Sequence, residues 1–142
     1  MNAPFKTSRR VEFRETDMAG IVHFSNFFTW MEQAEHEVWR FLGLGVISNI
    51  EGHTISWPRV SAECSYRRAL RFEEIIEVEI AIARIGTKSV TWVVRFFQAG
   101  QPVANGSITT VCCQIEHGQQ PVSIDIPKPI REKLSPLVEA PE

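Results

Sequence analysis

The stretch from Thr16 to Leu44 holds the clearest candidate for chemistry in this sequence. Asp17 stands on a short loop with Gly20, and the loop leads directly into a long segment with helical spacing. A carboxylate can attack a carbonyl carbon or activate a water molecule. Free N–H groups at the start of a helix, together with the helix dipole, can stabilise negative charge on an oxygen atom. Asp17 is therefore predicted to be the reactive group, beside a helix that supplies an oxyanion site.

Both loop residues also have a purely structural interpretation. Aspartate is common in turns, where it accepts backbone hydrogen bonds, and glycine permits the turn itself. Gly20 can serve the turn and at the same time let a substrate approach the backbone closely. The sequence GIVHFSN that follows Ala19 favours the chemical role for Asp17.

A helix is predicted over residues 25 to 42. Apolar residues recur there every three or four positions, as Phe27, Met31, Ala34, Val38 and Phe41, and polar residues occupy the other face. Ser25 and Asn26 are candidate N-caps. At about 1.5 Å per residue the helix is roughly 27 Å long. A helix of this length with one broad apolar face needs a sheet to bury it.

Strands are predicted on both sides of this helix. The alternation of apolar and polar residues indicates strands at 7–15, 54–70, 76–85, 88–98 and 103–116, with Pro58 interrupting the second. A Pro-rich tail follows from 127 to 142, with a short possible helix at 130–135. The order predicts a single α+β domain over residues 1–142, with the helix on one face of an antiparallel sheet.

The composition narrows the class of protein. The formal net charge is −2, which argues against a nucleic-acid binder. Three cysteines form no disulfide framework, and four histidines show no metal-ligand spacing. No signal peptide and no membrane-spanning run is recognisable. We therefore expect a cytoplasmic protein with no metal, no nucleic-acid partner and no membrane partner.

The segment FRETDMAGIVHFSNFFTWMEQAEHEVWRFLG resembles the hotdog-fold acyl-CoA thioesterases of the 4-hydroxybenzoyl-CoA thioesterase type. The positions that carry the resemblance are Asp17, Gly20, Ile21, Val22, His23, Phe24, Trp30 and Glu32. The resemblance implies a long central helix wrapped by a curved antiparallel β-sheet. It also implies a homodimer or homotetramer with active sites at the subunit interface.

The resemblance assigns candidate roles to single residues. Asp17 is the nucleophile or general base, the backbone N–H of Phe24 is the oxyanion donor, and Gly20 lets the substrate approach the backbone closely. The candidate substrate contacts are His23, Asn26, Trp57, Lys88 and Ser89, the last two on the coenzyme A portion; Arg67, Arg68 and Arg71 are weaker candidates. The implied activity is hydrolysis of a small aromatic or short- to medium-chain acyl-CoA, with coenzyme A entering as part of the substrate and no other cofactor.

Two other functions remain open at this stage. A hotdog hydratase or dehydratase needs an aspartate and a histidine acting together, and His23 is the available histidine. A non-catalytic module that binds acyl-CoA or an acyl carrier protein is the second alternative. A binder gains nothing from a desolvated carboxylate beside a thioester, so Asp17 argues against it.

Overall fold

The computed structural model describes residues 3–140. The chain forms, in order, β1 Phe5–Arg10, the 3-10 helix η1 Phe13–Glu15, α1 Ser25–Phe41, β2 Ser48–Ile50, β3 His53–Ser56, β4 Arg59–Tyr66, β5 Ile75–Ile85, β6 Ser89–Gln98, β7 Gln101–Val111, β8 Cys113–Gln114, β9 Val122–Ser123, α2 Lys128–Leu134 and η2 Ser135–Leu137.

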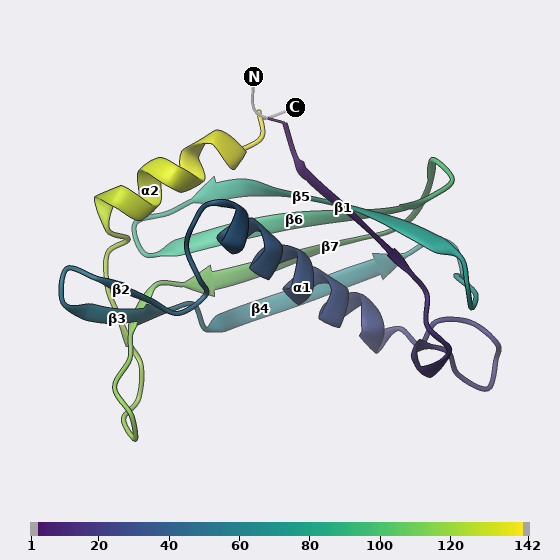
Figure 1. Ribbon diagram of the computed structural model, residues 1–142, viewed down its shortest axis with the longest axis horizontal. Helices are drawn as coiled ribbons and strands as arrows, with labels where there is room; N and C mark the ends of the chain where they lie inside the picture. The colour runs from purple at the N-terminus through teal and green to yellow at the C-terminus, as the bar shows by residue number, and fades with distance from the viewer. Residues whose placement is uncertain (1–2, 141–142) are drawn as a thin grey trace.

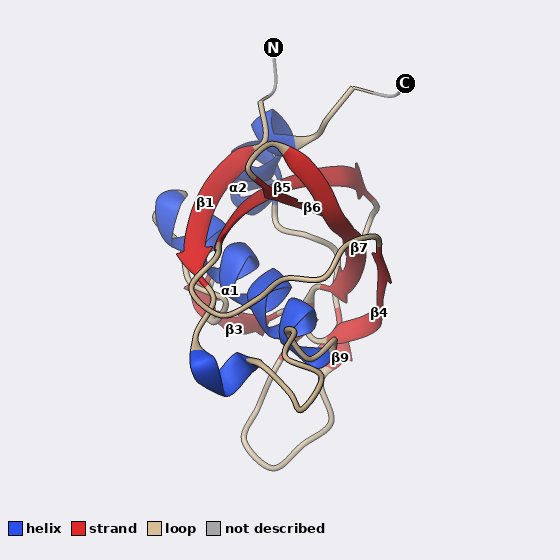
Figure 2. Cartoon of the chain, turned by 90° about the vertical axis from the view of Figure 1, so that its right-hand side faces the viewer, coloured by secondary structure: helices blue, strands red, loops and turns tan. Residues whose placement is uncertain are grey.

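The main sheet has five antiparallel strands in the order β1-β5-β6-β7-β4. A smaller sheet pairs the short strands in the order β2-β3-β8-β9. The long helix α1 crosses one face of the main sheet (Figure 1), and the end-on view places it between the edge strands β1 and β4 (Figure 2). The predicted α+β class, with one main helix on antiparallel strands, is confirmed.

The core lies between α1 and the central strands. The apolar face of α1 and the inward residues of β5, β6 and β7 belong to one buried cluster. Gly106 of β7 allows the closest approach, because a Cβ atom there would lie 2.5 Å from Met31 Sδ and 2.8 Å from the carbonyl oxygen of Glu63. Close packing of helix on sheet therefore depends on a missing side chain at this position.

The edge strand β4 contains a β-bulge. Arg59 pairs with Thr110 and Ser61 pairs with Thr109, so Val60 is one extra residue on this strand. Side chains alternate along a strand, and an extra residue shifts that alternation. Arg59 consequently lies on the same face as Ala62, toward α1, where the two residues line one cavity.

Several predicted boundaries shift in the structure. The helix is confirmed and ends at Phe41, but its N-cap is Phe24, and no side chain caps it. The run at 54–70 splits around Trp57 and Pro58, and the hairpin of β2 with β3 was not predicted. In the C-terminal segment, α2 covers residues 130–134 of the short helix expected at 130–135, and Ser135 begins η2. Helix α2 buries Ile130 and Leu134 in the common core, so this segment is more than a tail.

Candidate active site at the start of the long helix

Asp17 occupies a tight turn between η1 and α1. Its carboxylate Oδ1 accepts the N–H of Ala19 at 2.9 Å, and its carbonyl oxygen accepts the N–H of Gly20 at 2.9 Å. Gly20 has φ +79°, which explains the glycine at that position. Asp17 lines a cavity of about 380 Å³ together with Ile21, Val22, Phe24, Phe27, Tyr66, Arg67, Arg68, Ala69 and Leu70.

The buried residue Glu15 ties this turn to the helix. Its carboxylate accepts the Trp30 Nε1–H at 2.8 Å and the Glu12 N–H at 2.8 Å. Its carbonyl oxygen accepts the His23 N–H at 2.9 Å and the Asn26 side-chain amide at 2.8 Å. Two elements that border the Asp17 turn, η1 and the start of α1, are therefore fixed to each other by one residue.

The N-cap residue of α1, Phe24, leaves its backbone donor uncommitted. Within residues 3–140 the N–H of Phe24 has no hydrogen-bond acceptor, whereas its carbonyl oxygen accepts the N–H of Phe27 at 3.3 Å and the hydroxyl of Tyr66 at 3.1 Å. Desolvation is the main cause that raises the pKa of Tyr66 to about 12, and the neighbouring Cys64 adds to it. Tyr66 therefore remains a protonated donor that holds the Phe24 peptide in place.

Arginines gather around this cavity. Arg67 and Arg68 line it, and Arg71 Nη1 donates to the carbonyl oxygen of Gly20 at 3.4 Å. All three are exposed. The sequence had indicated this cluster only as a weaker candidate for the coenzyme A contact, and it had not indicated Tyr66. Tyr66 reaches the site by the pairing of β4 with β7, which no local motif reveals.

The other predicted substrate contacts lie apart from this cavity. His23 Nδ1 bonds to the hydroxyl of Ser25 at 2.7 Å, and the Asn26 amide donates to two backbone carbonyls. Trp57 is 1% exposed and stacks on Trp39 at 5.1 Å between ring centroids. Trp57 therefore offers no surface to a substrate, and we assign it to the core. Asn26 positions the turn.

Lys88 and Ser89 lie at the other end of the sheet from Asp17. The first residue of β5 lies next to Glu74, and Glu74 contacts Arg71, which lies beside the Asp17 cavity. Lys88 and Ser89 come after the last residue of β5. Eleven residues at about 3.3 Å each place the far end of β5 roughly 36 Å away. In Figure 1 the turn between β5 and β6 lies under α2, opposite the loop that follows η1. One chain alone does not bring Lys88 to Asp17.

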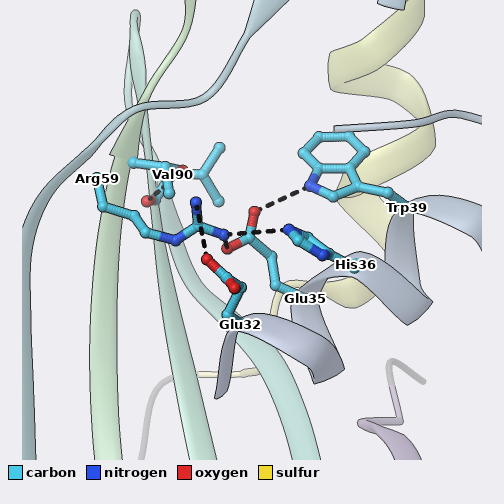
Figure 3. Close-up of polar contacts among 7 residues, drawn as sticks. Glu32, Glu35, His36, Trp39, Arg59 and Val90 are labelled. Carbon is cyan, nitrogen blue, oxygen red and sulfur yellow. Dashed lines mark hydrogen bonds and ion pairs between the residues drawn. The ribbon is translucent and has the colours of Figure 1, made fainter. Parts of the chain in front are cut away.

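A second polar cluster lies on α1 beside β4 (Figure 3). Glu35 is fully buried and accepts Arg59 Nη2 at 2.9 Å and Trp39 Nε1 at 3.0 Å. Burial raises the pKa of the Glu35 carboxyl, while Arg59 acts in the opposite direction. Glu32 lies 3.7 Å from Arg59, and His36 lies 3.5 Å from it. The sequence had indicated Glu32 through the resemblance but gave no sign of its arginine partner.

Residues 3–140 contain no group of three or more His, Cys, Asp or Glu side chains that could hold a metal ion. No helix in that range is both long enough and apolar enough to cross a bilayer.

Comparison with known proteins identifies the family. A family model described as "Thioesterase-like superfamily" matches residues 11–134. The chain belongs to this superfamily. Membership confirms the resemblance to hotdog-fold thioesterases and the predicted class of enzyme, a thioester hydrolase.

Three known proteins are similar to this chain in sequence or in structure. A protein from Aquifex aeolicus is 30% identical over 131 residues, which cover 92% of this chain and 98% of that protein. A 1,4-dihydroxy-2-naphthoyl-CoA hydrolase from Prochlorococcus marinus is 28% identical over 112 residues, covering 73% of this chain and 74% of its own. The structure of a gentisyl-coenzyme A thioesterase superposes with a TM-score of 0.80 at 27% identity, covering 92% of this chain and 99% of that one.

Proposed function

We propose that this protein hydrolyses acyl-CoA thioesters at Asp17. One observation carries the proposal: the Asp17 carboxylate lines the cavity that also contains Phe24, whose N–H has no acceptor among residues 3–140. A carboxylate and a free N–H at the positive end of a helix are the two groups that attack on a carbonyl requires. Arg67 and Arg68 at the same cavity suit the phosphates of coenzyme A.

The reaction has a definite course at these groups. Asp17 attacks the thioester carbonyl carbon itself or takes a proton from an attacking water molecule. Negative charge moves to the carbonyl oxygen, where the Phe24 N–H donates to it. The C–S bond then breaks, and coenzyme A leaves as a thiol after taking up a proton. A water molecule supplies the oxygen of the product acid, and no cofactor is consumed.

The acyl group is proposed to be a small aromatic or a short- to medium-chain group. The relatives named above support an aromatic group, because the Prochlorococcus protein is named for a naphthoyl ester and the structural relative for a gentisyl ester. The cavity beside Asp17 has apolar walls from Phe24, Phe27 and Leu70. A planar acyl group fits such walls.

We further propose a single hotdog domain over residues 1–142, with the sheet curved round α1, that works as a homodimer or a homotetramer in the cytoplasm. Seven of the eight residues of β4 are exposed, and β4 is the last strand of the main sheet. Antiparallel pairing of β4 with a second copy would cover this edge. It would also reverse the partner's sheet, so that Lys88 of the second copy approaches the Asp17 end.

The two alternatives receive less support. A hydratase needs a histidine that acts with Asp17, but His23 bonds to Ser25 and is not among the residues that line the Asp17 cavity. Binding alone gives no physical reason for the Asp17 carboxylate at this position, so a pure binding module is less well supported.

The test compares coenzyme A release by the wild type and by Asp17→Asn from benzoyl-CoA, butyryl-CoA and octanoyl-CoA. Asp125→Asn is the matched control, since Asp125 is exposed and lies outside the cavity. We expect Asp17→Asn to lose at least about 10²-fold in kcat, as is typical when a catalytic acid or base is removed, with an unchanged melting temperature. Near-full activity of Asp17→Asn would remove Asp17 from the mechanism, and release from no ester would overturn the proposed function.

A further inference from the structure

The side chain of Asn26 holds together the two ends of the Asp17 turn. Its amide nitrogen donates to the carbonyl oxygen of Glu15 at 2.8 Å and to the carbonyl oxygen of His23 at 3.2 Å. An amide NH2 group carries two N–H donors, so one side chain can serve both acceptors. Glu15 comes two residues before Asp17, and His23 comes directly before Phe24. Asn26 therefore bridges the segments that carry the proposed reactive carboxylate and the proposed oxyanion donor.

The bond to His23 bears directly on the N–H of Phe24. The carbonyl of His23 and the N–H of Phe24 belong to one peptide unit, which is planar and trans. The C=O and the N–H of a trans peptide point in opposite directions, so a contact that holds the oxygen also fixes the direction of the N–H. The same carbonyl oxygen accepts the backbone N–H of Asn26 at 3.0 Å. Two donors of Asn26 therefore hold the peptide whose N–H has no acceptor among residues 3–140.

The bond to Glu15 fixes the other end of the bridge. Glu15 is 8% exposed, and its carboxylate accepts the Nε1–H of Trp30 at 2.8 Å. Its carbonyl oxygen also accepts the N–H of His23 at 2.9 Å. The amide of Asn26 thus donates to an acceptor that is itself held in place by α1. The position of the Asp17 segment relative to the helix start is set before any substrate arrives, as electrostatic stabilisation of a transition state requires.

Helix capping and substrate contact do not account for these bonds. A capping side chain accepts hydrogen bonds from free backbone N–H groups at the helix start. Asn26 does the opposite, because it donates to the carbonyl oxygens of Glu15 and His23, which both precede the helix. Asn26 is also not among the residues that line the Asp17 cavity. The remaining role is to orient the peptide before Phe24.

We propose that Asn26 is a positioning residue that aims the Phe24 N–H at the thioester oxygen and keeps it in place relative to Asp17. The inference rests on the proposed thioesterase function. Because Asn26 does not touch the substrate, its effect appears when negative charge develops on the oxygen, and so in kcat rather than KM. Loss of a whole oxyanion donor typically costs about 10²- to 10³-fold in rate. The backbone N–H of Asn26 still holds His23 when the side chain is removed, so the loss should be smaller.

The experiment measures kcat and KM of Asn26→Ala for coenzyme A release from benzoyl-CoA, butyryl-CoA and octanoyl-CoA. The variant should fold, because the carbonyl oxygens of Glu15 and His23 each keep a backbone donor and alanine favours a helix. We expect kcat to fall at least about 10-fold while KM stays within about 2-fold of the wild type. Asn49→Ala is the matched control, since it removes a side-chain hydrogen bond with Thr54, at 2.9 Å, outside the Asp17 cavity. It should keep the wild-type kcat.

Asn26→Asp separates positioning from folding. The two side chains have the same shape, and a negative charge is favourable at the start of a helix, so this variant should fold. An ionised carboxylate has no N–H to donate, so kcat should fall as it does in Asn26→Ala. Wild-type kcat in either variant, an equal rise in KM, a loss shared by Asn49→Ala, or unfolding of both variants would overturn the positioning role while the thioesterase function stands. Release from no ester by the wild type would overturn both.

Discussion

The hydroxyl of Tyr66 donates a hydrogen bond of 3.1 Å to the carbonyl oxygen of Phe24. The two residues lie 42 positions apart in the chain, one at the end of the edge strand and one at the start of the long helix. The N–H proposed as the oxyanion donor belongs to the same residue, Phe24, in the peptide unit before this carbonyl. Strand β4 therefore reaches the proposed reaction centre through the backbone of the helix start, and Tyr66 is a positioning residue.

Replacement of Tyr66 by Phe should lower kcat more than it raises KM. The variant loses one hydrogen bond, worth about 0.5–1.5 kcal/mol, which corresponds to about 2- to 10-fold in rate. The ring contact with Phe27, at 5.1 Å between centroids, remains. Steady-state kinetics and a melting curve measure both effects. Thr91→Val removes another hydroxyl hydrogen bond, at 3.3 Å to Thr109 on the sheet, and should leave kcat unchanged. Wild-type kcat in Tyr66→Phe would contradict the positioning role.

Mixed dimers test whether Lys88 acts across a subunit interface. In a dimer of one Asp17→Asn chain and one Lys88→Ala chain, one site receives both wild-type residues and the other receives neither. Mixing the two variants under conditions that exchange subunits should therefore give more activity, at low acyl-CoA concentration, than the average of the separate variants. Activity equal to that average would place Lys88 outside the site. A monomer in light scattering would rule out the shared site altogether.

Gly106→Ala should destabilise the fold without altering the chemistry directly. The added Cβ would lie 2.8 Å from the carbonyl oxygen of Glu63, and a backbone atom cannot move aside as a flexible side chain does. Overpacking of this kind typically costs about 1–3 kcal/mol in the free energy of unfolding. Urea unfolding measures the cost, with Ser107→Ala on the same strand as a control expected to stay within about 0.5 kcal/mol. An equally small change for Gly106→Ala would show that α1 does not need this close contact.

The carboxyl of Glu35 should make stability depend on pH in a definite direction. Burial raises the pKa of Glu35 in the folded protein above its usual value of 4.5. Between 4.5 and the raised pKa the folded state binds more protons than the unfolded state, so the free energy of unfolding falls as pH rises. The contribution is fully present below 4.5 and is lost as pH passes the folded-state pKa.

Glu35→Gln removes this titration and isolates it. The stability of the wild type relative to Glu35→Gln should decrease as pH rises from below 4.5 toward neutral, by at most about 1.4 kcal/mol per pH unit. Urea unfolding of both proteins across this range gives the difference. A difference that grows with pH would mean that Arg59 outweighs burial and lowers the pKa of Glu35.

The sequence predicts features that depend on residues close together in the chain, and it misses those that depend on residues far apart. The spacing of Phe27, Met31 and Val38 predicts α1 almost to the residue, because helix periodicity is local. The Asp17 turn is local as well, with Gly20 at positive φ. Contacts across the sheet left no such pattern. Tyr66 and Arg59 reach α1 only through the pairing and bulge of β4, and Trp57 is buried by a stack with Trp39.

The extra residue in β4 divides that strand into two parts that can vary separately. Residues from Ser61 to Tyr66 keep their register with β7 whether or not Val60 is present, whereas the facing of Arg59 depends on it. Deletion of Val60 would turn the Arg59 side chain to the outer face of the sheet and leave the buried Glu35 unpaired. The esters hydrolysed by the wild type and by the deletion variant can be compared. The comparison would show whether loss of one residue from β4 changes the preferred acyl group while the residues beside Asp17 stay where they are.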